Sequence, residues 1–234
     1  MTRIGLALAS IGMAAALTAC GGGDDDFTSQ SGEKIADASK SAMKKLDAVK
    51  VTGTVKTSGN EVSLDIQTND KGDCTGSVGV GGGKAELLGV GGKIWFKPDE
   101  AFWKSSGGAS ADQIITLVGD KWVVVPSGGD GFDEFCDIDK LLDEMLKSDK
   151  DDDSTYKKRD VKKVDGDDAV PVEHKDSDGT STGYVRVDEP HYLVKIEKTD
   201  GDDAGSVTFS EFDEKFDVEA PAEDDIVDLS NLAG

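Results

Sequence analysis

A Gly-x-Ser-x-Gly string is the feature that comes closest to a catalytic nucleophile, since residues 179–183 read Gly-Thr-Ser-Thr-Gly. Hydrolases that use this motif place a strand before the serine and a helix after it. Here Ser181 follows an Asp-Gly turn, and the sequence from Tyr184 predicts a strand. Of the two histidines, His174 and His191, only His191 lies downstream of Ser181, and it directly follows Glu-Pro in another predicted turn. Nothing assembles a nucleophile, a base and an oxyanion hole, so we expect no enzyme.

Metal and phosphate sites are not indicated either. Two histidines without cysteine partners are too few for a structural zinc site. The stretch nearest to a calcium loop, residues 176–179, does not complete the spaced D-x-D-x-D-G series that ends in a glutamate, and it predicts a hairpin turn. In the glycine-rich run 76–92, no lysine is followed by Ser or Thr, as a phosphate loop requires. We therefore predict no metal and no cofactor, and we expect these glycines to let a curved sheet bend.

Cys20 is the residue with the clearest covalent chemistry. Arg3 and the 14 apolar residues 4–17 are typical of a secretory signal peptide, and the apolar run is too short to span a membrane. The sequence Leu17-Thr-Ala-Cys20 resembles the lipobox of bacterial lipoproteins. The resemblance implies removal of residues 1–19, a diacylglyceryl thioether on Cys20 and an acyl group such as palmitate on its amine. The mature chain would then be anchored to the cell membrane on its extracytoplasmic side. The alternative is an ordinary signal peptide that ends near a cysteine.

The other cysteines, Cys74 and Cys136, are left as a pair once Cys20 carries lipid. Outside the cytoplasm two thiols of one chain tend to be oxidised, and a bond between them would close a loop of about 60 residues. We expect a disulfide, with two free thiols as the alternative. No C-x-x-C motif supports redox catalysis.

The charge balance excludes one class of partner. The chain has 48 acidic and 26 basic side chains, a formal net charge of −22. Such a surface repels polyanions, so nucleic-acid binding is excluded. The acidic residues occur in short clusters that are typical of solvated turns and tails. The partners that stay open are the membrane through the Cys20 lipid, a lipid ligand and an envelope protein.

The rest of the chain predicts one domain. Residues 20–32, rich in Gly, Asp and Ser, predict an acylated flexible tether, and residues 33–230 a single folded domain. Apolar residues recur every three or four positions over 33–49, which predicts a helix, and two shorter helices are predicted at 111–118 and 133–147. Alternating or apolar runs predict strands at residues 49–56, 62–66, 74–80, 84–90, 93–97, 121–125, 156–164, 170–175, 182–187, 192–199 and 206–211.

This order of elements predicts an α+β fold with a large curved antiparallel sheet of about ten strands and helices on one face. The strands come in runs without helical crossovers, which excludes a doubly wound α/β protein. Several fragments also stand in a familiar order: residues 51–55, 92–96, 137–142, 183–187, 192–196, 209–212 and 218–221. Together they resemble the LolA-like superfamily, and within it the lipoproteins of the LppX and LprG kind. The resemblance implies a half-open β-barrel closed by helices, with an apolar cavity that carries acyl chains.

The concave face of such a sheet is either filled by helix side chains or hollow for a ligand. Apolar residues of the predicted strands and of the helix at 111–118 are the candidates to line it: Val51, Val55, Leu64, Ile66, Val78, Leu87, Ile94, Phe96, Ile114, Leu117, Trp122, Val124, Val185, Val194 and Ile196. A hollow face would make the protein a carrier of a lipid or another apolar ligand. A packed face would leave an envelope interaction or scaffold lipoprotein without a ligand.

Overall fold

The computed structural model of the protein describes residues 24–57, 59–126, 132–146, 154–177, 179–201 and 203–229. The predicted signal peptide, residues 1–19, and the predicted lipidation site Cys20 lie outside these residues. None of the helices in the described ranges is long and apolar enough to cross a membrane.

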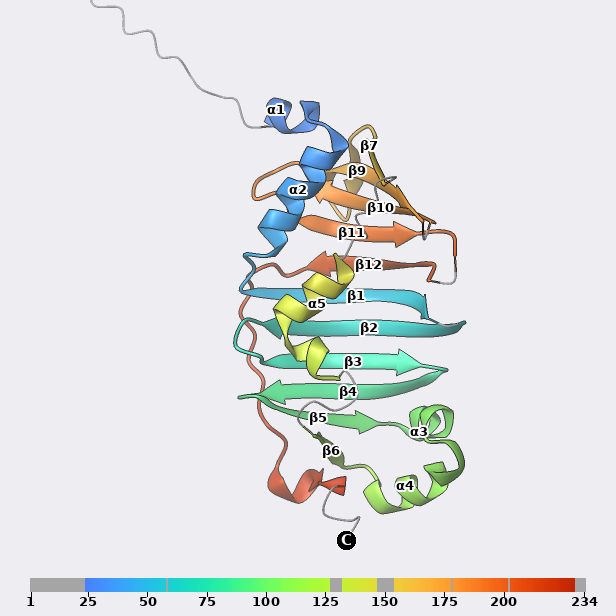
Figure 1. The fold of residues 1–234 in the computed structure, drawn as a ribbon. Helices are drawn as coiled ribbons and strands as arrows, with labels where there is room; N and C mark the ends of the chain where they lie inside the picture. The colour runs from blue at the N-terminus through green and yellow to red at the C-terminus, as the bar shows by residue number, and fades with distance from the viewer. Residues whose placement is uncertain are drawn as a thin grey trace, which may run out of the picture.

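The described strands form one open sheet of 13 strands (Figure 1). They are β1 (Ala48–Thr57), β2 (Asn60–Asn69), β3 (Cys74–Val80), β4 (Gly83–Val90), β5 (Lys93–Pro98), β6 (Trp122–Val125), β7 (Thr155–Lys158), β8 (Lys162–Val164), β9 (Asp167–Asp176), β10 (Gly179–Arg186), β11 (Leu193–Lys198), β12 (Gly205–Ser210) and β13 (Ile226–Val227). Their order is β13-β6-β5-β4-β3-β2-β1-β12-β11-β10-β9-β7, and β8 also pairs with β9. The pairs are antiparallel except β13, which lies parallel to β6.

The 13 strands exceed the eleven strand ranges predicted from the sequence for two local reasons. The segment 156–164 is a single strand in the sequence prediction, but it bends at Arg159 and becomes β7 and β8, both paired with β9. The two-residue strand β13 is too short to leave a periodic pattern in the sequence. The α+β class and the large antiparallel sheet are confirmed.

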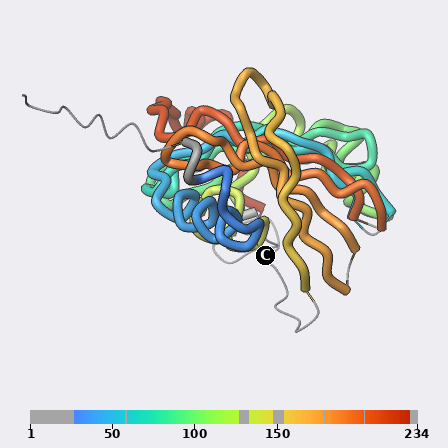
Figure 2. Tube along the Cα trace, turned by 90° about the horizontal axis from the view of Figure 1, so that it is seen from above, coloured from blue at the N-terminus to red at the C-terminus, as the bar shows by residue number. Residues whose placement is uncertain are grey.

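Helices cover one face of the sheet. They are α1 (Asp24–Ser29), α2 (Gly32–Met43), α3 (Glu100–Ser106), α4 (Ala111–Val118) and α5 (Ile138–Met145), with short 3-10 turns η1 (Gly108–Ser110), η2 (Phe132–Cys136) and η3 (Glu223–Asp225). Figure 1 shows α2 and α5 in front of the strands, and Figure 2 shows α2 on the hollow side of the curved sheet. At the other end of the sheet, α3 lies against β4 and β5, and α4 packs on α3.

The main core lies between α2, α5 and the middle of the sheet. Ile35 and Met43 of α2 are fully buried in one cluster with Val51 of β1, Phe209 of β12 and Leu142 of α5. The amphipathic periods of both helices turn these residues toward the strands, because positions three or four apart share one helix face. An ion pair between α2 and α5 joins the exposed sides of the two helices, Lys44 Nζ to Asp143 Oδ1 at 3.2 Å. The middle of the concave face is therefore solidly packed.

The folded part begins earlier than the sequence predicts. Residues 24–32, expected to belong to a flexible tether, instead form α1 and the start of α2. Phe27 is 3% exposed in the main core, and its ring stacks on that of His191 with centroids 3.6 Å apart. The single aromatic residue in a Gly- and Asp-rich stretch provides the apolar surface that docks this segment on the domain.

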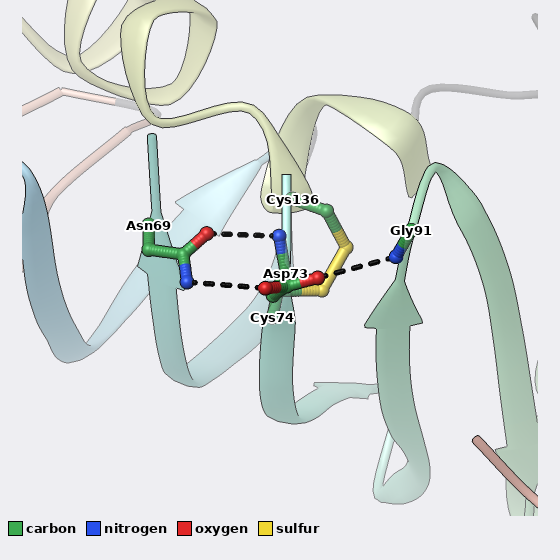
Figure 3. The surroundings of a disulfide bond; sticks show 5 residues. All are labelled: Asn69, Asp73, Cys74, Gly91 and Cys136. Atoms are coloured by element: carbon green, nitrogen blue, oxygen red, sulfur yellow. Dashed lines mark hydrogen bonds between the residues drawn. A yellow bond between two sulfur atoms is a disulfide. The ribbon is translucent and has the colours of Figure 1, made fainter. Parts of the chain in front are cut away.

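A disulfide joins Cys74 of β3 to Cys136 of η2, directly before α5 (Figure 3). Both cysteines are buried. The bond passes over Gly89 of β4, where a Cβ would lie 2.8 Å from the sulfur of Cys74 and 2.9 Å from that of Cys136, so the disulfide needs glycine at this position. Beside it, the carboxylate of Asp73 accepts a hydrogen bond from the backbone N–H of Gly91 at 3.2 Å and ties the turn after β4 to β3.

Candidate functional site

An open groove of about 580 Å³ lies on the concave face, beyond the end of α5. The strand ends that form it come from β1, β2 and β9 to β12, and Glu144 and Met145 of α5 form its wall. Here α5 ends and no described helix covers the strands. The groove is thus the part of the concave face that the helices leave open.

The floor of the groove is apolar. Val55 of β1, Leu64 of β2, and the facing pair Ile196 and Val207 of β11 and β12 line it. All four point to the helix side of the sheet, because the antiparallel registers align their side chains with those of Val51 and Phe209 in the core. The position of Gly205 in the floor must be glycine, since a Cβ would lie 2.4 Å from the backbone oxygen of Thr54.

The end of the groove at β9 and β11 is polar. His174 Nδ1 lies 3.3 Å from Asp176 Oδ2, and both side chains are less than one-fifth exposed. The ring of Tyr156 packs against that of His174, with centroids 4.5 Å apart. Among the described residues, the buried Nε2 atom of His174 has no hydrogen-bond partner. The groove thus combines an apolar floor with a hydrogen-bonding end.

The second polar pair of this end is Lys198 and Asp203. Lys198 Nζ lies 2.8 Å from each carboxylate oxygen of Asp203. The hydrogen bond from Lys198 is the main reason that the pKa of the Asp203 carboxyl lies below its ordinary value. The carboxylate of Asp203 therefore stays charged at neutral pH. No group of three or more His, Cys, Asp or Glu residues within the described ranges could hold a metal ion.

Ten of the fifteen predicted lining residues point to the concave face, but the structure divides them. Only Val55, Leu64 and Ile196 line the groove. The others pack beneath the helices and the disulfide, or toward α3 and α4: Val51, Ile66, Val78, Leu87, Ile94, Phe96 and Val185. The concave face is thus packed along most of its length and open at one end, which combines the two alternatives of the sequence analysis.

The prediction that Ile114 and Leu117 of the helix at 111–118 line the concave face is wrong. Leu117 is 53% exposed, because the buried positions of α4 are Ala111 and Val118, seven residues apart on one helix face. Ile114 packs in a satellite cluster with Trp103 and Val118, away from the groove. Neither residue lines the groove.

Three strand residues point to the convex face instead. Trp122 and Val124 alternate with Val123, which pairs with Phe96 and is buried on the concave side. The prediction for β6 was therefore one residue out of phase, which reverses every side chain. Val194 lies at an irregularity between β10 and β11 and packs in a separate cluster with Ala169 and Tyr184.

Sequence reasoning missed Val207, His174 and Lys198. The strands that carry them were predicted, and simple alternation would have found each one. Val207 is two residues before Phe209, His174 two after Val172, and Lys198 two after Ile196. His174 and Lys198 are polar residues at inward positions, so a pattern of alternating apolar residues does not indicate them.

Comparisons with known proteins bear on the fold. No model of a known protein family matches the sequence, and no curated protein matches it. LprF from Mycobacterium bovis is similar in structure, with a TM-score of 0.56 and 16% identity over 82% of this chain and 97% of LprF. The lipoprotein LppX from Mycobacterium tuberculosis has a TM-score of 0.50 and 14% identity over 80% of this chain and 97% of LppX. At such identities the likeness shows the fold alone, and it confirms the LolA-like fold that the sequence fragments indicated.

Proposed function

We propose that this protein is a non-enzymatic extracytoplasmic lipoprotein, anchored through an acylated Cys20, that binds the acyl chain of a lipid or another apolar ligand in the groove on its concave face. The observation that supports this best is the groove itself, in whose apolar floor Val55, Leu64 and Ile196 are only half-buried, beside the buried Val207. The similar structure of the lipoprotein LppX is consistent with such a role.

The size and chemistry of the groove suit an amphiphile. Its volume of about 580 Å³ lies within the ~300–1,000 Å³ that is usual for small-molecule sites. Each methylene that an acyl chain buries on the floor contributes about 0.8 kcal/mol. A chain lying along Ile196 and Leu64 would bring its polar head to the end of the groove that Lys198 and Asp176 line. The polar head would thereby fix the direction in which the chain lies.

The first test is binding of a fluorescent fatty-acyl probe by the chain from residue 21 onward, which retains α1. We expect saturable binding that Leu64→Arg weakens at least about tenfold, because an unpaired charge on an apolar floor costs several kcal/mol. Ser63→Arg is the matched control. Ser63 is exposed next to Leu64 in the same strand and points to the convex face, so this variant should bind the probe like the parent. Circular dichroism checks that both variants keep the sheet.

Absence of saturable probe binding by the folded parent would contradict the ligand proposal. It would favour the alternative, an envelope interaction protein without a ligand. The packed middle of the concave face supports that alternative. Equal weakening by Leu64→Arg and Ser63→Arg would place the probe outside the groove.

A further inference from the structure

One strip of this acidic protein is strongly basic. Residues 157–163 read Lys-Lys-Arg-Asp-Val-Lys-Lys, five basic side chains and one acidic in a chain of net charge −22. They form the end of β7, the bend and the start of β8, along the outer side of β9. We call residues 157–163 the basic edge. It is the border of the sheet on the side opposite β13 (Figure 1).

An exposed apolar side chain lies in the middle of the basic edge. Val161 is 45% exposed between Arg159 and Lys162. Lysines on an edge strand serve to block pairing with other chains, and that role needs no exposed valine. Basic residues around an exposed apolar side chain are instead the composition that binds the interface of an anionic membrane.

Only part of the basic charge is neutralised by neighbours. Arg159 forms a bidentate ion pair with Glu173, at 2.7 and 2.6 Å, and Lys163 lies 3.0 Å from Asp168. Lys162 donates to the Tyr184 hydroxyl at 3.2 Å, and that hydroxyl donates in turn to the carboxylate of Glu197. The side chains of Lys157, Arg159, Lys162 and Lys163 stay exposed to solvent.

The basic edge lies beside the start of the folded chain. Lys158 Nζ donates to the backbone carbonyl of Thr28 in α1, and a Cβ on Gly32 of α2 would lie 3.0 Å from the backbone nitrogen of Lys158. Figure 1 places α1 and β7 at the same end of the molecule. Four peptide steps separate Cys20 from Asp24, and these span at most about 14 Å. An anchor at Cys20 therefore keeps the basic edge close to the membrane surface.

We propose that the basic edge is a second membrane contact, which docks on anionic lipid headgroups and orients the domain. This rests on the proposed anchoring through Cys20. The contact is made by the exposed basic side chains and Val161. Docking in this way turns the polar end of the groove toward the bilayer, because His174 pairs with Tyr156 of β7 directly behind the basic edge. A lipid would enter or leave the groove at that end.

The test measures which lysines of the acylated full-length protein are protected from an amine-reactive reagent in vesicles. The vesicles are phosphatidylcholine alone or phosphatidylcholine with phosphatidylglycerol. We expect Lys162 and Lys163 to be protected only with the anionic lipid and at low salt, because the attraction is screened by ions. The exposed lysines Lys93 and Lys121, at the other end of the sheet, should react equally in all vesicles.

Matched variants separate the charge from the apolar contact. Lys157→Gln should lower the protection of Lys162 about fivefold, whereas Lys93→Gln should leave it unchanged. Val161→Glu should also lower it, whereas Leu117→Glu, at the other exposed large apolar residue of the described chain, should not. All four residues are exposed, so folding is expected to be unaffected.

Equal labelling of Lys162 in neutral and anionic vesicles would overturn the proposal, as would protection that high salt leaves unchanged. A second arm removes the dependence on cellular acylation. In it the thiol of Cys20, in the chain from residue 20 onward, is coupled to a maleimide-bearing phospholipid before labelling. If Lys162 is protected in this arm but the protein isolated from cells carries no acyl group on Cys20, the result would contradict the anchor and support the basic edge. If the protein is acylated on Cys20 but Lys162 is not protected in either arm, only the basic edge would be contradicted.

Discussion

Tyr192 shows at the residue scale how packing changes chemistry. Its ring stacks on Phe212, with centroids 4.5 Å apart, and its hydroxyl donates to Asp213 Oδ2 at 2.8 Å. Burial, and next the hydrogen bond to Asp213, raise the pKa of Tyr192 from 10.0 to about 12. Both causes favour the neutral phenol in the folded state.

This pKa predicts a loss of stability at alkaline pH. Between about pH 10 and pH 12 the unfolded chain loses the Tyr192 proton while the folded chain keeps it, so the folded state binds more protons. The free energy of unfolding should therefore fall as pH rises through this range. Urea unfolding at a series of pH values checks this, and Tyr192→Phe should flatten the fall. An identical slope in Tyr192→Phe would contradict the assignment to this residue.

At the scale of elements, α5 decides how much of the concave face is open. Its first turn is capped by Asp137, whose carboxylate accepts a hydrogen bond from the N–H of Lys140 at 3.1 Å. Directly before the cap, the Cys74–Cys136 disulfide ties the chain to β3. From this fixed start α5 crosses the sheet, and it ends with Met145 at the wall of the groove (Figure 1).

Removing the disulfide should destabilise the domain strongly. The bond joins residues 62 apart in sequence, and on the chain-entropy model a loop of this size contributes about 4 kcal/mol. We expect Cys74→Ala with Cys136→Ala to lower the free energy of unfolding in urea by about that amount. Reductant should lower the stability of the parent similarly and leave the double variant unchanged. If reductant leaves the urea unfolding transition of the parent unchanged, the prediction would be contradicted.

At the scale of the whole molecule, the charges are unevenly placed. The acidic excess gives a net charge of −22, while the basic edge at 157–163 lies at the end where the folded chain begins. An anionic membrane would repel most of this surface and attract that end. The placement of charge and the proposed anchor at Cys20 thus favour the same orientation.

The anchor is itself a prediction for the whole molecule. Cys20→Ser should leave an uncleaved precursor or release the protein to the medium, because the thiol that takes the diacylglyceryl group is missing. Two or three acyl chains, at about 0.8 kcal/mol per buried methylene, would otherwise hold the mature chain firmly in the membrane. Intact-mass measurement and membrane fractionation check both points. Thr18→Ser keeps a small residue before the cleavage site and should anchor normally. An unchanged mass and full membrane retention of Cys20→Ser would contradict lipidation of Cys20.

The sequence alone was enough to predict the class of fold, most strands, the helices α2, α4 and α5, and the partner of each central cysteine. These depend on local periodicity and on which residue types can pair. It also predicted Val55, Leu64 and Ile196, because they stand at inward positions of clearly alternating strands. Where the pattern is continuously apolar, as in Trp122–Val125, alternation carries no phase, and the predicted face was wrong.

Only the tertiary structure decided where the concave face is filled and where it is open. That depends on where α5 starts and ends over the sheet, which the disulfide and its packing against α2 determine. It also showed that Phe27 belongs to the core and that the basic edge lies beside α1. The contact of Lys158 with Thr28 joins residues 130 apart in the chain, and Phe27 and His191 are farther apart still. No local pattern in a sequence records which distant surfaces meet.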